Sequence, residues 1–244
     1  MYQNLIRNAR ELKLIIKFEK YMKKWETNLY ICFMKLHYLL RKPYTIDENT
    51  RLLVMLHGYG SNEEDLFSFV PSLPENWLVV SFRAPILSSY GGYAWYNINF
   101  TDVDQFIDME QAEEALKEIT SNIQDIQQEY GISGKTHLMG FSQGGILSYA
   151  LALRNPENYQ KIAILSAYPE LKILQNLSRN TKALQELDFF ISHGMEDGVI
   201  PLDLARTAAE LLEDLGIHFS FREYMSGHSV NQKNYIDLMS FLER

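Results

Sequence analysis

The sequence predicts an α/β fold in which a largely parallel sheet is covered by helices on both faces. Two observations predict it. From Leu36 onward, apolar runs of strand length alternate with segments whose apolar residues recur at helical spacing. The early runs are apolar at nearly every position, which is typical of strands buried on both faces of a sheet. Alternation of this kind joins parallel strands through helical crossovers.

The expected strands are short apolar runs that end at a glycine, a proline or a polar loop. The run at 51–58 ends at Gly58, and the run at 77–85 ends at Pro85. Both residue types interrupt strand pairing, so each marks the start of a loop. In chain order the expected strands are "LHYLL" (36–40), "RLLVMLHG" (51–58), "WLVVSFRAP" (77–85), "THLMGF" (136–141), "KIAILSA" (161–167), "DFFISHG" (188–194) and "HFSFREY" (218–224).

The longest expected helix has apolar residues from Ala112 to Tyr130 that are spaced three or four apart, which places them on one face. Gly131 follows and is a favourable stop. The spacing also suits a coiled coil, but the stretch is shorter than the roughly three or four heptads that a coiled coil needs. A helix packed on the sheet is therefore preferred. Further helices are expected at 143–155, 202–216 and 231–244.

Charge divides the chain into two parts. Residues 1–42 contain ten Lys or Arg and three Asp or Glu, whereas residues 43–244 contain thirteen and twenty-eight. The acidic body argues against nucleic-acid binding, which needs a basic surface. Neither a linker nor an internal repeat follows residue 43, so residues 34–244 are interpreted as a single domain.

Residues 1–33 are predicted to be a basic extension outside this domain. Their apolar residues fall at helical spacing among Lys and Arg, so a basic amphipathic helix at a membrane surface or a partner is the alternative. Lys17 interrupts the short apolar run "LIIKF", which is therefore a poor signal peptide. Because no apolar run approaches the roughly 18 residues of a membrane span, no stable membrane insertion is expected.

The sequence predicts neither a disulfide nor a cofactor. Cys32 is the only cysteine, which fits a reducing compartment and a cytoplasmic protein. "HGYGSN" lacks the third glycine of a dinucleotide site, and Glu129 stands where a phosphate loop ending in "GKT" needs glycine. A dense cluster of metal-ligating residues is also missing from the sequence.

Ser142 lies in "GFSQGG", between an expected strand and an expected helix. The pattern Gly-x-Ser-x-Gly at such a junction is typical of a nucleophile elbow, where a tight turn exposes the serine hydroxyl. Gly140 and Gly144 avoid collisions with the neighbouring strand and helix. The alternative is a glycine-rich turn with an incidental serine, so the assignment depends on a base and an acid downstream.

His228 is the preferred base, because it lies in a loop between the last strand and the last helix. His218 opens a strand at the wrong end of the sheet, and His193 precedes the candidate acids. In this type of site the partners follow in the order serine, acid, histidine, each on a loop after a strand. That order favours His228 over the default interpretation of a surface residue.

Asp197 is the preferred acid. It follows a strand, and Gly198 after it suits a tight turn toward the histidine. Glu196 remains an alternative, while Asp203 is expected to begin the next helix. Asp188 opens its strand at the opposite end and is rejected.

The oxyanion needs two N–H donors. One is expected from the backbone of Gln143, the residue after the serine, and the other from Tyr59 in the loop after an early strand. His57 in that loop is expected to brace it through hydrogen bonds. Residues 84–102 are expected to form a long loop, and loops of this length are usually functional or disordered. Trp95 in this loop is expected to shape a substrate pocket, with simple packing of the loop as the close alternative.

Five motifs occur in order: "LHGYGSNEEDL", "FRAP", "GFSQGG", "HGMEDGVIP" and "GHS". This set resembles the phospholipase/carboxylesterase family of α/β-hydrolases, which includes small bacterial carboxylesterases and acyl-protein thioesterases. The resemblance runs from about Leu36 to the C-terminus. It implies a serine hydrolase of carboxylic esters or thioesters, with Ser142, Asp197 and His228 as the triad and with Tyr59 and Gln143 as oxyanion donors.

The expected function is hydrolysis of a small-molecule ester with a short to medium acyl chain through an acyl-enzyme on Ser142. Acyl-protein thioesterases usually carry leucine at the position of Tyr59 and an acidic residue at that of Asn97, which favours an ester substrate here. Thioesterase, lysophospholipase, peptidase, lactonase and membrane-associated lipase are alternatives within hydrolases. A non-catalytic binding protein is the alternative from another class, and the oligomeric state is left open.

Overall fold

The computed structural model describes residues 35–244 apart from residues 90, 100 and 102–105. The basic extension predicted at residues 1–33 lies outside the described residues and stays a prediction. In the described part of the chain, no helix is both long enough and apolar enough to cross a membrane.

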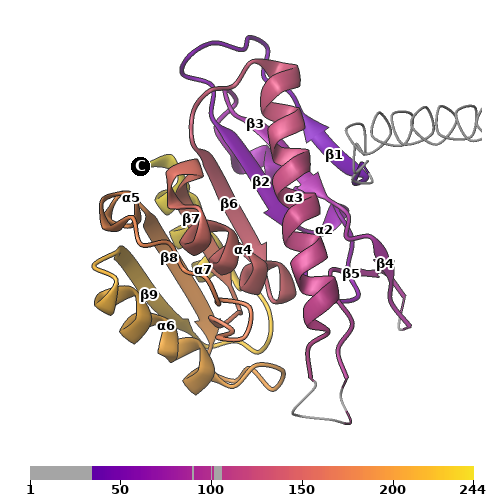
Figure 1. Cartoon of the computed structure of the whole chain (residues 1–244), viewed down its shortest axis with the longest axis vertical. Helices are drawn as coiled ribbons and strands as arrows, with labels where there is room; N and C mark the ends of the chain where they lie inside the picture. Colours follow the sequence, from indigo (N-terminus) through magenta and orange to yellow (C-terminus); the bar gives the residue numbers. More distant parts are fainter. Residues whose placement is uncertain (1–34, 90, 100, 102–105) are drawn as a thin grey trace, which may run out of the picture. The chain divides into compact units, whose positions relative to one another are not determined.

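Seven strands form the main sheet of the described residues, in the spatial order β1-β3-β2-β6-β7-β8-β9 (Figure 1). β1 pairs antiparallel with β3, and the other neighbours in this sheet are parallel. The predicted α/β fold is therefore confirmed. Because parallel strands share a direction, the loops that follow them leave from one edge of the sheet, where ligands bind in such folds. The strands are Tyr38–Arg41 (β1), Leu52–Leu56 (β2), Leu78–Phe82 (β3), Thr136–Phe141 (β6), Tyr159–Leu165 (β7), Asp188–Gly194 (β8) and His218–Tyr224 (β9).

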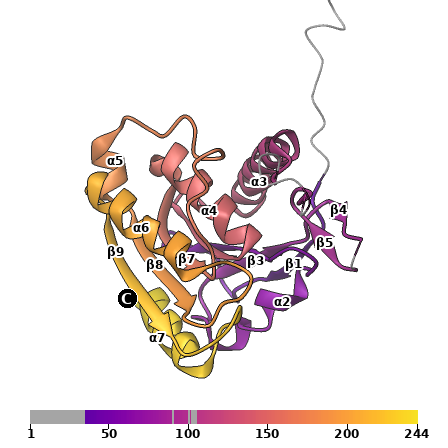
Figure 2. The same cartoon turned by 90° about the horizontal axis from the view of Figure 1, so that it is seen from below.

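Helices cover both faces of the sheet (Figure 2). Side chains alternate along a strand, and in β2 the side chains of Leu52 and Val54 pack in the core beneath α3, α4 and α6, whereas Leu53 and Met55 pack in a second core with α2 and α7. All five residues of β2 are buried, as expected of a strand covered on both sides. The helices are Glu64–Phe67 (α2), Met109–Tyr130 (α3), Gln143–Arg154 (α4), Thr181–Gln185 (α5), Leu202–Asp214 (α6) and Gln232–Glu243 (α7).

The ends of α3 follow from its capping residues. The Asp108 side chain accepts a hydrogen bond from the Gln111 N–H at 3.1 Å, which satisfies one of the free donors of the first turn. Gly131 ends the helix in the left-handed region at φ 67°. The predicted helix with its glycine stop is thus confirmed, and it packs on the sheet rather than in a coiled coil.

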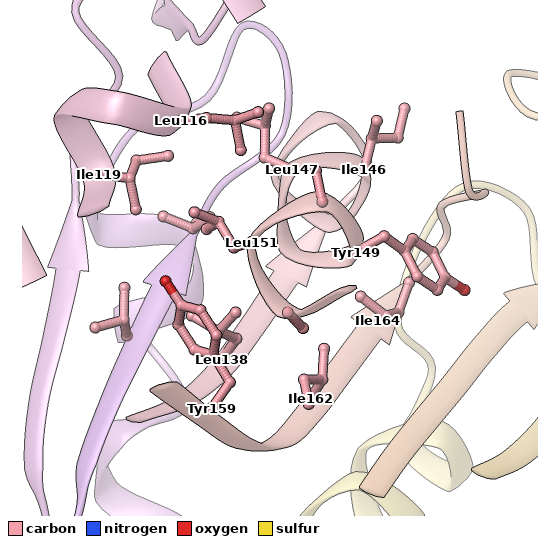
Figure 3. Close-up of a cluster of buried hydrophobic side chains, with 14 of the residues drawn as sticks. Leu116, Ile119, Leu138, Ile146, Leu147, Tyr149, Leu151, Tyr159, Ile162 and Ile164 are labelled. Carbon is pink, nitrogen blue, oxygen red and sulfur yellow. The ribbon is translucent and has the colours of Figure 1, made fainter. Parts of the chain in front are cut away.

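The core on this face fixes α4, the helix that follows Ser142. Leu116 and Ile119 of α3 point toward Leu147 and Leu151 of α4, beside Leu138 of β6 (Figure 3). Each of these side chains is buried, which stabilises the fold by about 1.5–3 kcal/mol per residue. Burial extends around all sides of α4, so the helix is a rigid base for the turn that precedes it.

The structure differs from the sequence prediction in its smallest elements. Within the predicted loop 84–102, Ile86–Leu87 (β4) and Tyr93–Ala94 (β5) form a two-stranded hairpin, which the prediction missed. Its strands are two residues long and cannot show a periodic pattern. For the same reason the short helices α2 and α5 were not predicted.

Candidate active site

Ser142 lies in a strained turn between β6 and α4. Its backbone adopts φ 52° and ψ −116°, a conformation that is rare for a residue with a side chain and costs about 1–3 kcal/mol. The Ser142 N–H donates to the Leu165 carbonyl of β7 at 2.9 Å, and the Ser142 carbonyl accepts from Ile146 at 3.0 Å in the first turn of α4. These contacts hold the strained turn from both sides. The geometry matches the predicted strand–turn–helix junction.

The glycines around Ser142 are required by close backbone contacts. A Cβ atom at Gly144 would overlap the Leu56 carbonyl of β2, and one at Gly140 would overlap the Gly144 carbonyl. At Gly145 a Cβ would lie 2.6 Å from the Ala167 Cβ, closer than nonbonded carbons approach. The motif therefore encodes tight packing of the turn against its neighbours, with Ser142 at its centre.

The structure brings His228 to Ser142 and Asp197. The His228 Nε2 lies 3.0 Å from the Ser142 Oγ, and its Nδ1 lies 2.7 Å from the Asp197 Oδ2. A carboxylate only accepts hydrogen bonds, so Nδ1 carries a proton and Nε2 is left to accept the serine proton. The Phe141 ring packs against the imidazole, with centroids 4.9 Å apart.

The loops that carry Asp197 and His228 are tied together by their backbones. The Met195 N–H donates to the Tyr224 carbonyl at 2.8 Å, and the Glu196 N–H donates to the Ser226 carbonyl at 3.0 Å. Gly194 ends β8 beneath this second loop, and a Cβ there would overlap the Gly227 carbonyl. Two short loops far apart in sequence are thus held side by side.

The Asp197 carboxylate is buried and well supplied with donors. Its Oδ1 accepts hydrogen bonds from the Val199 and Ile200 N–H groups at 2.8 and 2.9 Å. Burial by itself raises the pKa of this carboxyl, but the hydrogen bonds from Ile200, His228 and Val199 outweigh burial and lower the pKa below its ordinary value. Asp197 is therefore held ionised beside His228.

Four other candidate acids and bases lie outside this hydrogen-bonded series. The Glu196 side chain is exposed, and the exposed Asp203 side chain pairs with Arg206 at 3.1 Å. Asp188 and His218 form a pair with each other at 2.7 Å at the start of β8 and β9, the opposite end of the sheet. The positions of Asp203, Asp188 and His218 agree with the sequence arguments against them. The sequence left Glu196 open, and its exposed side chain separates it from the buried Asp197.

The two expected oxyanion donors lie beside Ser142 on the wall of one cavity. Gln143 is the first residue of α4, and the first N–H groups of a helix have no partner within that helix. Tyr59 lies in the loop after β2, where Gly60 adopts φ 76° and donates its N–H to the Tyr93 carbonyl at 2.8 Å. His57 braces the same loop: its Nδ1 contacts the Gly58 carbonyl at 2.7 Å, and its Nε2 accepts from the Ala84 N–H at 3.0 Å.

The Gln143 side chain has a function that the sequence prediction missed. Its Oε1 accepts from the Trp95 N–H at 2.8 Å, and its Nε2 donates to the Tyr96 carbonyl at 2.7 Å. The Trp95 indole in turn donates to the His57 carbonyl at 3.0 Å. This network joins the serine turn to the loop that holds Tyr59. Nothing in the local pattern around Gln143 identifies partners almost fifty residues away.

Trp95 requires a correction. The indole is completely buried and does not line the cavity beside Ser142, so it does not form the wall of a substrate pocket. Its hydrogen bond to the His57 carbonyl and its packing at 5.5 Å from the His57 ring make it a brace of the loop after β2. The neighbouring Tyr96 and Ile98 line the cavity instead.

Replacing Gln143 by alanine is expected to lower both stability and activity. The change leaves the Trp95 N–H and the Tyr96 carbonyl buried without their partner, so the free energy of unfolding falls by about 2–5 kcal/mol. The value of kcat/KM for a short ester falls about tenfold, because the serine turn and the loop after β2 lose their link. Urea unfolding and steady-state kinetics measure both effects.

Gln127→Ala is the control for this substitution. The Gln127 amide donates to the Gly134 carbonyl at the opposite end of the sheet, so its removal should leave activity unchanged. An active, fully stable Gln143→Ala variant would contradict the linking role.

The cavity beside Ser142 has a volume of about 670 Å³ and is mostly apolar. Ser142 and His228 face into it, and volumes of this size suit small-molecule ligands. Among the described lining residues, Glu170 and Lys172 are the only Asp, Glu, Lys or Arg side chains. The remaining lining residues are Tyr59, Tyr96, Ile98, Phe106, Ile107, Gln143, Ile146, Tyr168, Val199, Ile200, Pro201 and Leu204.

Over the described residues, no group of three or more His, Cys, Asp or Glu side chains is arranged to hold a metal ion.

Comparison with known proteins identifies the family. The model of the family described as Phospholipase/Carboxylesterase matches residues 44–244. The chain belongs to the phospholipase/carboxylesterase family. The fold is accordingly that of the α/β-hydrolases, as the resemblance implied.

Individual relatives agree with this family. The chain is 26% identical over 234 residues to acyl-protein thioesterase 1 of Emericella nidulans, covering 84% of this chain and 95% of that protein. It is 31% identical over 159 residues to acyl-protein thioesterase 1 of Kluyveromyces lactis, covering 62% of this chain and 68% of that protein. Among solved structures, esterase PE8 superposes with a TM-score of 0.73 at 25% identity, over 86% of this chain and 99% of that one.

Proposed function

We propose that the protein is a serine hydrolase that cleaves carboxylic esters through an acyl-enzyme on Ser142. The observation that carries the proposal is the hydrogen-bonded series Ser142–His228–Asp197, with distances of 3.0 and 2.7 Å, at the wall of an apolar cavity. Membership of the phospholipase/carboxylesterase family supports ester hydrolysis independently of this geometry.

In the proposed mechanism, His228 Nε2 accepts the Ser142 proton as the hydroxyl oxygen attacks the ester carbonyl. Asp197 orients the ring and stabilises the imidazolium. The N–H groups of Tyr59 and Gln143 donate to the oxyanion, each contributing about 3 kcal/mol to stabilisation of the transition state. His228 then donates its proton to the leaving alcohol. A water molecule, deprotonated by His228, then attacks the acyl-enzyme, and His228 returns the proton to the Ser142 oxygen as the carboxylic acid leaves.

The apolar cavity is proposed to hold the acyl chain. Its lining of aliphatic and aromatic side chains removes apolar surface from water, at about 25 cal/mol for each Å² that the chain buries. Apart from Glu170 and Lys172, the described lining is uncharged at neutral pH, so most of the wall offers no partner for a charged acyl group. Uncharged acyl chains of short to medium length are therefore the proposed substrates.

Thioester hydrolysis is a second candidate, because two relatives of this chain are named acyl-protein thioesterase 1. The same serine, base and oxyanion donors serve both reactions. Comparing kcat/KM for an oxygen ester and a thioester with the same acyl group separates the two activities.

Labelling with a fluorophosphonate probe tests the proposal directly. An activated serine displaces fluoride and keeps the phosphonyl group, so one equivalent of label on Ser142 is expected by mass spectrometry. The Ser142→Ala variant should stay unlabelled. Ser68→Ala, which alters an exposed serine of the loop after α2, should label like the unaltered protein. A folded protein that takes no label would instead be a binding protein on a hydrolase scaffold.

A further inference from the structure

We propose that His193 is a positioning residue for the active site. Its Nε2–H holds the loop that carries Asp197, and it also contacts the carboxylate oxygen to which His228 is hydrogen-bonded. The inference rests on the proposed function and adds a residue to it. His193 stands at the end of β8, four residues before Asp197, and its side chain is completely buried. From the sequence, His193 was only a competing candidate for the base.

The contacts of His193 place it behind Asp197. Its Nε2 lies 2.8 Å from the Ile200 carbonyl oxygen and 3.3 Å from the Asp197 Oδ2. That Oδ2 is the same oxygen that lies 2.7 Å from the His228 Nδ1. Two imidazoles therefore meet at one carboxylate oxygen, and the nearer one belongs to the proposed base.

The hydrogen bonds determine the proton position on His193. A carbonyl oxygen and a carboxylate only accept, so Nε2 carries the proton and is shared between the Ile200 carbonyl and Asp197. The Nδ1 atom is buried and has no hydrogen-bond partner among the described residues. A second proton there would be a buried donor without an acceptor, which is unfavourable by about 1–3 kcal/mol or more. His193 thus acts as a fixed N–H donor rather than as a second base.

Ile200 links this donor to the carboxylate. Its carbonyl accepts from His193, while its own N–H donates to the Asp197 Oδ1 at 2.9 Å. The two bonds close a ring from the end of β8 through the Asp197 loop and back to β8. Ile200 also lines the substrate cavity, and Pro201 after it is the N-cap residue of α6. His193 therefore fixes the carboxylate, one wall of the cavity and the start of a helix together.

Loss of the His193 donor should move the carboxylate away from His228. The ring through Ile200 opens, and the short contact between Asp197 and the His228 Nδ1 weakens. A weaker carboxylate contact disfavours the protonated imidazole. The pH at which kcat/KM falls on the acid side should therefore decrease, together with kcat, because the imidazolium also forms in the transition state.

Other ionisable groups around the site are few in the described part of the chain. Asp197, in the loop after β8, contacts His228, and His193 at the end of β8 contacts Asp197. Five more ionisable groups lie on the cavity wall. They are Tyr59 in the loop after β2, Tyr96 before α3, and Tyr168, Glu170 and Lys172 in the loop after β7. None of these is altered in the experiment below.

The experiment compares three variants of His193 with the unaltered full-length protein. The amide N–H of His193→Gln reaches the position of Nε2, whereas that of His193→Asn ends near Nδ1 and cannot reach Ile200. His193→Leu removes the donor altogether. Rates of p-nitrophenyl butyrate hydrolysis are measured from pH 5 to pH 9 and are normalised to active sites titrated with the fluorophosphonate, which corrects for unfolded protein.

For the leucine and asparagine variants we expect kcat to fall about tenfold or more, with KM within about twofold and the acid limb displaced to lower pH. His193→Gln should restore the limb and most of kcat. If the pH–rate profiles of the variants instead overlay that of the unaltered protein, and only the amount of folded enzyme is reduced, His193 stabilises the core alone. That result would overturn the proposal. Failure of all three variants to fold would overturn it equally. Labelling of the unaltered protein tests the proposed function by itself, so the two failures are distinguishable.

Discussion

Replacing Ser142 by alanine is expected to lower kcat/KM for p-nitrophenyl butyrate by about 10⁴-fold to 10⁶-fold, while the protein stays folded. The acyl-enzyme cannot form without the hydroxyl, and only binding and the oxyanion donors remain to assist attack by water. Stability should change little, because alanine occupies the same strained backbone conformation and Ser142 is only partly buried. Steady-state kinetics and urea unfolding of the same preparations measure the two effects.

A double variant tests whether Ser142 and His228 act together. Because residues that act as a unit are strongly non-additive, Ser142→Ala combined with His228→Gln should be no slower than Ser142→Ala alone. His218→Gln provides the matched histidine control at the opposite end of the sheet and should retain full activity. Retention of more than about a tenth of kcat/KM by Ser142→Ala would exclude Ser142 as the nucleophile.

Replacing Gly144 by alanine is expected to prevent folding, or to lower the free energy of unfolding by more than about 4 kcal/mol. The added methyl group would overlap the carbonyl of Leu56 and lie 2.7 Å from that of His57. Both atoms belong to the backbone, and Leu56 is paired with Gly140 in the sheet. Neither rotation of a side chain nor a small shift relieves the overlap, so β2, β6 or the first turn of α4 must move.

Gly134→Ala is the matched control for this substitution. Gly134 lies in the loop before β6, nothing lies within 4 Å of a Cβ built there, and its backbone lies outside the left-handed region. The same change of residue should therefore be neutral or slightly stabilising, by up to about 1 kcal/mol. Circular dichroism with thermal and urea unfolding compares the two variants. Equal stability of both would mean that the turn at Gly144 is looser than the structure describes.

The main elements of the fold were predictable because their signals are local. The bounds predicted for β6, β8 and β9 agree with the structure, and α3 ends at its glycine. Apolar periodicity and a stop residue are contained in a few consecutive positions. The hairpin at β4 and β5 was missed, because its two-residue strands depend on pairing with each other rather than on a pattern of their own.

The order of the site residues was also predictable, whereas their contacts were not. Motif and chain order led to Ser142, Asp197 and His228, but the two hydrogen bonds between them span 86 and 31 residues. Trp95 was wrongly expected at the cavity, because an aromatic residue in a long loop fits a pocket and a brace equally well. Only burial separates the two roles, and burial depends on the whole fold.

By itself, the sequence determined the α/β fold, the strained turn at Ser142 and the order of serine, acid and histidine. Each follows from the size, polarity and backbone freedom of neighbouring residues, which act over a few positions. The tertiary structure alone decided that the Gln143 side chain joins two loops, that Trp95 braces one of them, and that His193 lies behind Asp197. These roles depend on which distant atoms meet once parallel strands align their ends, because a hydrogen bond is set by distance in space and not by separation along the chain.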